Sequence, residues 1–420
     1  MLNLLKILFI VLSTVLVWRY MVYTADTIPP FVQDEIANDQ AAVSFLADGR
    51  YKSDRYDLAY SSGIAVTWPG GVGWRWAGSL FGARIGCVVF SWLAALALGL
   101  CFFRRMRYSV LDALAVTACL WALTVTSPFA MPYWHGFMYN LGELNTAILI
   151  GFALLLLVRH PFWSAFILGI AVWHGKLVYL PFVIAILLGD FLSRSLSKQE
   201  IFKSVMVYAI VFSSPLVLWV AWLCRGGDTS VLQEWFRGQY GWFMHMASLH
   251  HKVATPGIPS EGSLGGRFSS SHLEWAGYSL GTKIKNLLLS VGAISFVWMS
   301  LIKLKDAGLN VGKRAFWISI LLTVCVGLHT VYHFFFHPSM WQRHFQPSLY
   351  VGLGLVVFWG TQWSKKLGPR VKGYAYIAMC SLVLVQGGIV LRHPLLSREI
   401  SYARSCVDLY SSVCDPTLYP

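Results

Sequence analysis

Two adjacent acids, Asp34 and Glu35, stand shortly after the first long apolar stretch of the chain ends. A carboxylate can take the proton of an attacking hydroxyl group, so an acid pair at a membrane boundary suits general-base chemistry near the head group of a lipid. The same pair would also stabilise the N-terminal end of a helix, where backbone N–H groups and the helix dipole favour negative charge. The second interpretation requires a helix that begins near residue 34.

A third acid, Glu143, stands at the start of another apolar stretch, directly after "YWHGFMYNLG". A charged side chain at bilayer depth costs about 2.5–3.5 kcal/mol on insertion scales, so it usually faces protein or water. Glu143 is predicted either to stabilise the N-terminal end of a helix or to bind an acceptor or a cation.

Basic residues stand at two further membrane boundaries. Lys176 lies alone near the middle of the apolar stretch 162–192, which has basic residues beyond both ends. This pattern predicts a hairpin of two short helices that turns at Lys176, and broken helices of this kind often form binding sites. Arg343 and His344 precede a late apolar stretch, and the planar guanidinium group of Arg fits phosphate oxygens. The alternatives are a lysine that extends its amine to water and an arginine that anchors its helix at the interface.

The elements that position these residues are predicted to be membrane helices. The chain has 420 residues, of which 56% are hydrophobic and only 12% charged, too few charges to cover a soluble protein of this length. Apolar runs of about 18 residues or more recur along it. The net charge of +14 does not require nucleic acid, because much of it lies in short loops, where Lys and Arg mark the cytoplasmic side. We therefore expect an all-α, multi-pass integral membrane protein.

Placing the basic loops in the cytoplasm gives roughly eleven crossings that alternate without contradiction. They are predicted at 4–23, 79–102, 108–127, 142–158, 162–175, 177–192, 205–224, 284–302, 315–336, 346–364 and 373–391. The expected organisation is a transmembrane module, 1–391, with large outer loops at 24–78 and 225–283, followed by an extracytoplasmic tail, 392–420. In that tail, Cys406 and Cys414 are predicted to form a disulfide, because the compartment is oxidising.

The first outer loop is predicted to contain an amphipathic helix at 34–48 that lies on the membrane surface. Apolar residues recur at helical spacing, and Gly49 is a normal helix terminator. The loop then continues to "SSGIAVTWPGG", a Gly- and Pro-rich entry into the second span.

Several motifs in order resemble the GT-C superfamily, polytopic glycosyltransferases that use lipid-phosphate sugars, such as protein O-mannosyltransferases and the aminoarabinose transferases of lipid A. The first is the Asp–Glu pair with Gly49 fifteen residues after Asp34, although Asn38 stands where the family has an aromatic residue. The others are "SSGIAVTWPG", "NLGELNTAILIGFALLLL" (140–157), "GIAVWHGKLVYLPFVIAILL" (169–188) and "MWQRHFQPSLYVGLGL" (340–355).

The resemblance implies transfer of a sugar from a polyprenyl-phosphate donor to an extracytoplasmic glycan, lipid or protein in a bacterial inner membrane, without nucleic acid. It implies that Asp34 is the general base and that Glu35 orients it or binds an acceptor or metal. Glu143, Lys176, Arg343 and His344 would then bind substrate. A divalent cation is the one cofactor left open. His329, His333 and His337 recur every fourth residue, but no acid or cysteine completes a site, so no metal ligand is predicted.

The alternatives are a transporter or flippase, and a polymerase or ligase, of lipid-linked saccharides. A transporter more often has internal repeats and short loops on both faces. The large outer loops and the lack of a convincing sequence repeat favour the transferase.

Overall fold

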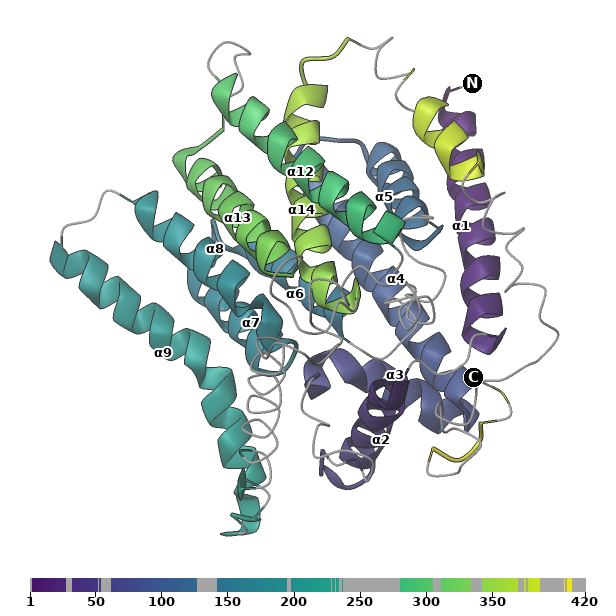
Figure 1. Ribbon diagram of the computed structural model, residues 1–420, viewed down its shortest axis with the longest axis vertical. Helices are drawn as coiled ribbons and strands as arrows, with labels where there is room; N and C mark the ends of the chain where they lie inside the picture. The colour runs from purple at the N-terminus through teal and green to yellow at the C-terminus, as the bar shows by residue number, and fades with distance from the viewer. Residues whose placement is uncertain are drawn as a thin grey trace, which may run out of the picture. The chain divides into compact units, whose positions relative to one another are not determined.

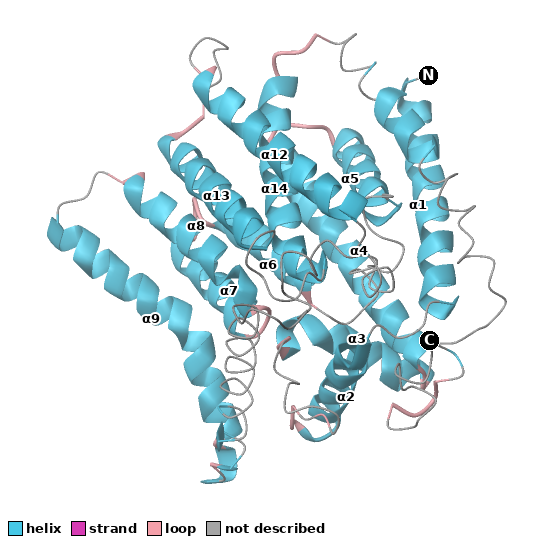
Figure 2. Ribbon diagram, viewed as in Figure 1, coloured by secondary structure: helices cyan, strands magenta, loops and turns pink. Residues whose placement is uncertain are grey.

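The computed structural model describes most of the chain. The described residues are 2–27, 32–51, 53, 62–126, 142–194, 198–227, 229–230, 232–233, 236, 280–304, 311–333, 342–368, 374, 377–385, 404 and 406–409. All regular structure within these ranges is helical (Figure 2). The chain forms two compact units, which are described separately below. Unit 1 comprises Met1–Ile148 and Leu367–Pro420, and unit 2 comprises Leu149–Lys366.

Unit 1 is built on two long helices and three shorter ones, which are labelled in Figure 1. They are α1 (Leu2–Thr27), α2 (Val32–Asp48), α3 (Ile64–Ala77), α4 (Leu80–Arg105) and α5 (Val110–Thr126), followed by the start of α6 (Glu143–Leu156). Helix α4 packs against α3 and α5, α1 packs against α5, and α2 packs against α3.

Glycines allow α3 and α4 to approach each other at backbone distance. A Cβ atom added at Gly73 would lie 2.1 Å from the carbonyl oxygen of Gly82, and one added at Gly86 would lie 2.2 Å from that of Pro69. No side chain fits in these spaces, so the Gly-rich sequence is a packing requirement of this helix pair.

Helix α3 is an element that the sequence analysis did not predict, because its Gly and Pro residues resemble a loop leading into the second span. It ends at Gly78, which has a φ of 62°, and Ser79 then caps α4 by accepting a hydrogen bond from the N–H of Gly82 at 3.3 Å. A left-handed glycine followed by a serine cap separates the two helices.

Unit 2 contains the remaining helices. After α6 come α7 (Pro161–Trp173), the short η1 (Leu177–Tyr179), α8 (Leu180–Leu192), α9 (Lys198–Leu223), the short η2 (Arg225–Gly227), α12 (Leu280–Ile302), α13 (Lys313–Val331) and α14 (Gln342–Ser364). Helix α7 packs against α9, α8 packs against α13, and α12, α13 and α14 pack against one another.

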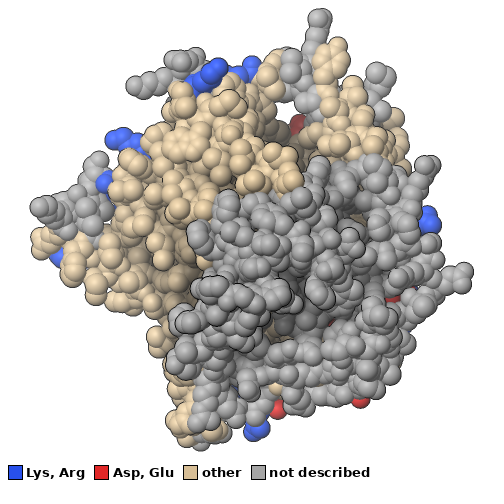
Figure 3. Space-filling view, viewed as in Figure 1, with Lys and Arg blue, Asp and Glu red and all other residues tan. Residues whose placement is uncertain are grey.

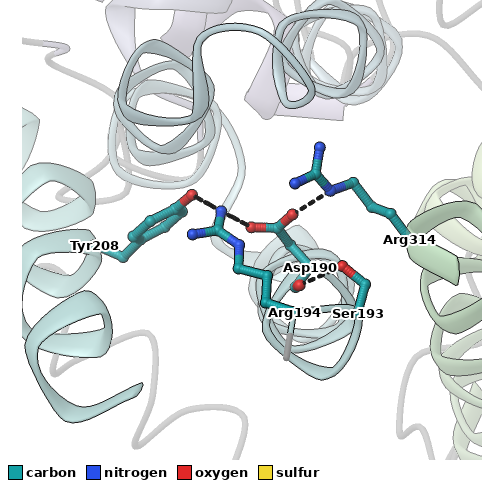
Figure 4. Close-up of polar contacts among 5 residues, drawn as sticks. All are labelled: Asp190, Ser193, Arg194, Tyr208 and Arg314. Atoms are coloured by element: carbon teal, nitrogen blue, oxygen red, sulfur yellow. Dashed lines mark hydrogen bonds and ion pairs between the residues drawn. The ribbon is translucent and has the colours of Figure 1, made fainter. Parts of the chain in front are cut away.

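A buried carboxylate joins three elements at one end of unit 2 (Figure 4). Asp190 of α8 is fully buried and forms ion pairs with Arg194 and with Arg314 of α13, while Tyr208 of α9 donates to it at 3.3 Å. Burial lowers the pKa of Arg194, but Asp190 and Tyr208 together raise it above its usual value, so the guanidinium remains charged. Arg194 and Arg314 come from two loops predicted to be cytoplasmic, and their shared partner places both loops at the same end of unit 2.

The described helices have the length and surface of membrane helices. Three are long and apolar enough to cross a membrane, at Leu80–Arg105, Phe202–Leu223 and Lys313–Val331, and further apolar helices are shorter. Large apolar side chains such as Ile210, Val217 and Leu218 are more than 60% exposed. On the face drawn in Figure 3, the described surface is largely uncharged, with Lys and Arg at its margins. The all-α membrane fold is thus confirmed, and the number of crossings remains a prediction.

Candidate functional site

The acid pair lies in the first turn of α2. This helix begins at Val32 and ends at Asp48, and Gly49 follows with a φ of 76°, as expected of the predicted terminator. The N–H of Gly49 donates to the carbonyl of Phe45 at 2.8 Å. The backbone of Asp34 belongs to this helix, but its side chain lies outside the described part of the structure.

Glu35 is held by a buried arginine. Its two carboxylate oxygens accept from Nε and Nη2 of Arg84 at 2.7 and 2.9 Å, and both side chains are fully buried. Nη1 of Arg84 donates to the carbonyl oxygen of Ala25 at 3.0 Å. A bidentate pair of this kind fixes orientation as well as distance. It therefore ties the start of α2 to α4 and to the end of α1, which fits the orienting role predicted for Glu35.

Other polar side chains of α2 are also buried in unit 1. Asn38 donates to Ser62 Oγ at 3.3 Å, and Gln40 accepts from Ser53 Oγ at 2.6 Å. Tyr51 donates to the carbonyl of Ser62 at 2.5 Å. Helix α2 thus packs within unit 1 through polar as well as apolar residues.

The C-terminal tail contacts α2 beside the acid pair. Cys406 and Leu409 pack with Ile36 of α2 and Leu80 of α4 in one buried cluster. The N–H of Leu80 donates to the carbonyl of Cys406 at 2.9 Å, and Gln40 donates to that of Leu409 at 3.0 Å. This docking was not predicted, because nothing in the tail's own sequence specifies its partner.

The tail also contains a disulfide-bonded cysteine. Cys406 is disulfide-bonded, whereas the six cysteines of the described helices and turns, at positions 87, 101, 119, 224, 325 and 380, are free. This agrees with the predicted bond to Cys414, which itself lies outside the described residues.

Glu143 is the first residue of α6 and is buried, with 4% of its surface exposed. Gly142, with a φ of 82°, precedes it, and a Cβ atom there would lie 2.5 Å from Val66 of α3. Asn145 donates to the carbonyl of Val66 at 3.1 Å. The start of α6 is therefore packed against α3, where Glu143 is positioned in a first helical turn.

Lys176 lies at the predicted turn between two short helices. Helix α7 ends at Trp173, and α8 begins at Leu180 after η1. Lys176 is only 7% exposed, so it does not extend its amine to bulk water. Beside it, His174 Nε2 lies 2.9 Å from the carbonyl oxygen of Pro215, which fastens the turn to α9. The two-helix hairpin is confirmed, and its location on the same side of the membrane as Asp34 remains a prediction.

Arg343 and His344 lie in the first turn of α14, but their side chains are outside the described part of the structure. The residues that follow them are buried: Phe345, Gln346 and Ser348. Ser348 Oγ lies 2.6 Å from His329 Nδ1, and the ring of Phe345 lies 5.3 Å from that of His333. The four-residue spacing identified the two histidines, whereas Gln346 and Ser348 were missed.

The predicted site residues are distributed over both units. Asp34, Glu35 and Glu143 belong to unit 1, and Lys176, Arg343 and His344 belong to unit 2. Within the described ranges, no group of three or more His, Cys, Asp or Glu side chains could hold a metal ion, and His337 lies outside those ranges.

Neither a scan against protein-family models nor a search of curated proteins finds a match to this chain. Among solved structures, the chain resembles ArnT from Cupriavidus metallidurans in the apo state, with 16% identity and a TM-score of 0.46 over 92% of this chain and 65% of that one. It also resembles ArnT from the same organism bound to undecaprenyl phosphate, with 14% identity and a TM-score of 0.48 over 97% of this chain and 74% of that one. The chain thus spans just under two thirds of the first structure.

Proposed function

We propose that this chain is a membrane glycosyltransferase that moves a sugar from a polyprenyl-phosphate donor to an extracytoplasmic acceptor. The observation that carries the proposal is the buried bidentate pair between Glu35 and Arg84, directly after the candidate base in sequence. Arg84 occupies both carboxylate oxygens of Glu35 and fixes the first turn of α2, at 2.7 and 2.9 Å. Asp34 precedes Glu35 on the same fixed turn, and a general base needs a supporting structure that holds it in place.

In the proposed reaction, the carboxylate of Asp34 takes the proton of an acceptor hydroxyl group. The hydroxyl oxygen forms a bond to the anomeric carbon, and the bond from that carbon to the phosphate oxygen breaks. The lipid phosphate leaves with the electron pair, so negative charge develops on it and positive side chains stabilise it. Lys176, Arg343 and His344 are the proposed phosphate-binding residues, and Glu143 is proposed to bind the acceptor or a cation.

The buried pair between Glu35 and Arg84 supports different roles for Glu35 and Asp34. Both carboxylate oxygens of Glu35 accept hydrogen bonds from the buried guanidinium of Arg84, which holds this side chain in place. Glu35 therefore serves as the orienting residue in this proposal. The donor, the membrane location and the acceptor class follow from the resemblance to the GT-C superfamily in the sequence motifs.

The test is turnover by the purified full chain with a panel of labelled polyprenyl-phosphate sugars and added acceptors. We expect the sugar of one donor to appear on an acceptor, with release of the lipid phosphate. If the protein instead moves these lipids between the leaflets of vesicles without cleaving the sugar–phosphate bond, the proposal is wrong and the flippase alternative replaces it.

A further inference from the structure

Four buried polar atoms on α12 and α14 have no hydrogen-bond partner within the described structure. These atoms are Nδ2 and Oδ1 of Asn286, Oγ of Ser290 and Oε1 of Gln346. Each of these side chains is more than nine-tenths buried, with exposed fractions of 4%, 3% and 6%. Buried polar groups in proteins are nearly always satisfied, so unsatisfied ones call for a ligand or bound water.

The packing of α12, α13 and α14 places these atoms at one end of the three helices. A Cβ atom on Gly352 of α14 would lie 3.7 Å from Ala293 of α12, and one on Gly327 of α13 would lie 3.7 Å from Ile294. Further along, Trp363 Nε1 of α14 donates to Ser300 Oγ of α12 at 2.9 Å. Helices α12 and α14 are therefore parallel to each other. Helix α13 is antiparallel to α14, because its His329 contacts Ser348 and its Ser319 contacts Trp359.

This register arranges six polar residues in two layers. An α-helix rises about 1.5 Å per residue. Along the helix axes, Ser290, His329 and Ser348 form the inner layer, about 3–6 Å from the contacts at Ala293, Gly327 and Gly352. Asn286, His333 and Gln346 form the outer layer, about 9–11 Å away by the same count. We call these six residues the outer-end cluster, since they lie at the ends of α12 and α14 opposite Lys303 and Lys365, and at the end of α13 opposite Arg314.

The cluster is polar but carries no carboxylate, ammonium or guanidinium group. Beyond its inner layer, the helices continue with buried apolar residues such as Val297, Val326 and Leu355. Carboxamides offer both donors and acceptors, and hydroxyl groups offer one donor and two acceptor lone pairs. A neutral group with many hydroxyls satisfies such atoms, whereas a charged group would need a counter-ion to be buried here.

We propose that the outer-end cluster binds the sugar ring of the lipid-linked donor, with Asn286, Ser290 and Gln346 hydrogen-bonding its hydroxyl groups. The inference rests on the proposed function and specifies its donor subsite. Arg343, one of the proposed phosphate-binding residues, precedes Gln346 by three positions on α14, which is close to one helical turn. Sugar and phosphate of one donor molecule would thus contact consecutive turns of the same helix.

The test is equilibrium binding of two lipids to the full chain in nanodiscs. One is undecaprenyl phosphate, and the other is undecaprenyl phosphate esterified to glucose, mannose, galactose or arabinose. We expect the parental protein to bind one sugar-bearing lipid more tightly than the bare lipid phosphate. Ser290→Ala and Asn286→Leu should each reduce that preference on the order of 5- to 10-fold, the worth of one or two hydrogen bonds, without changing the affinity for the bare lipid.

Ser300→Ala is the matched control, because it removes a buried hydroxyl from the same helix at a distance of about 15 Å along its axis. It should lower the melting temperature, since Trp363 loses a partner, and leave the lipid preference unchanged. Ser290→Ala should leave the melting temperature unchanged or raise it, because its hydroxyl is unsatisfied in the ligand-free chain.

The outcomes separate the two proposals. If the parental chain binds both lipids and Ser290→Ala and Asn286→Leu keep the parental preference, the cluster binds only water and this inference is wrong, while the proposed function stands. If the parental chain binds neither lipid, the proposed function fails and the inference fails with it.

Discussion

Arg84 binds both carboxylate oxygens of Glu35 in a fully buried pair, at 2.7 and 2.9 Å, although 49 positions separate the two residues. The pair joins α2, which carries the candidate base, to α4, which is long and apolar enough to span a membrane. The pair therefore fixes the first turn of α2, which includes the backbone of Asp34, relative to α4.

Removing one partner of this pair should lower the stability of the fold. Arg84→Met would leave the Glu35 carboxylate buried without its cation, and we expect a loss of stability of about 3–5 kcal/mol. The double variant Glu35→Gln with Arg84→Met should lose less than the sum of the single variants, because no uncompensated charge remains. Unfolding of the purified variants in detergent measures both. Additive losses would mean that the two side chains do not interact.

Replacement of the candidate base should separate catalysis from helix capping. Asp34→Asn keeps size and hydrogen-bonding shape but removes the basicity of the carboxylate, so transfer should slow on the order of 100-fold or more while donor binding is retained. Asn caps helices about as well as Asp, so a capping residue would tolerate the change. Asp48→Asn, at the exposed opposite end of α2, is the matched control and should transfer at the parental rate. Parental turnover by folded Asp34→Asn would shift the search for the base to Glu35 or Glu143.

Helix positions were predictable from sequence because they depend on local patterns. Apolar periodicity and Gly49 defined α2, and the lone Lys176 between two basic ends defined the α7–α8 hairpin. Helix α3 was missed because glycines needed for close packing against α4 look like a loop. Partners that are distant in sequence were missed as well.

One signal for such a partner was present in the sequence. Arg84 interrupts an apolar stretch, and an ionisable residue within a membrane helix usually has a partner. The identity of that partner depends on tertiary packing, which a single sequence does not encode as a local pattern. The same holds for the tail residues that contact Ile36 and Leu80.

The proposed phosphate-binding residues should affect donor affinity as well as rate. Lys176→Ala and Arg343→Ala each remove positive charge that acts in both the bound and transition states, so we expect weaker binding of undecaprenyl phosphate together with slower transfer. Lys303→Ala, an exposed lysine just after the end of α12, controls for a loss of positive charge. Titration of the bare lipid phosphate distinguishes these variants from Asp34→Asn. Unaltered affinity in Lys176→Ala would remove that residue from the phosphate site and leave it as a helix-turn residue.

The tail should stabilise α2 through its disulfide. Cys406→Ser removes the predicted bond to Cys414. Closing the short loop between these two cysteines stabilises the fold by about 2–3 kcal/mol in the chain-entropy model. Because Cys406 and Leu409 pack on Ile36, one position beyond Glu35, loosening the tail should also release the start of α2 and slow transfer. Melting temperature and turnover should therefore fall together in Cys406→Ser, and a reductant should lower both in the parental chain to the level of the variant. Cys101→Ser, at an exposed and free cysteine of α4, should change neither. If Cys406→Ser melts at a lower temperature but transfers sugar at the parental rate, the tail stabilises unit 1 without positioning Asp34, and the Glu35–Arg84 pair alone holds the turn on which the proposed base stands.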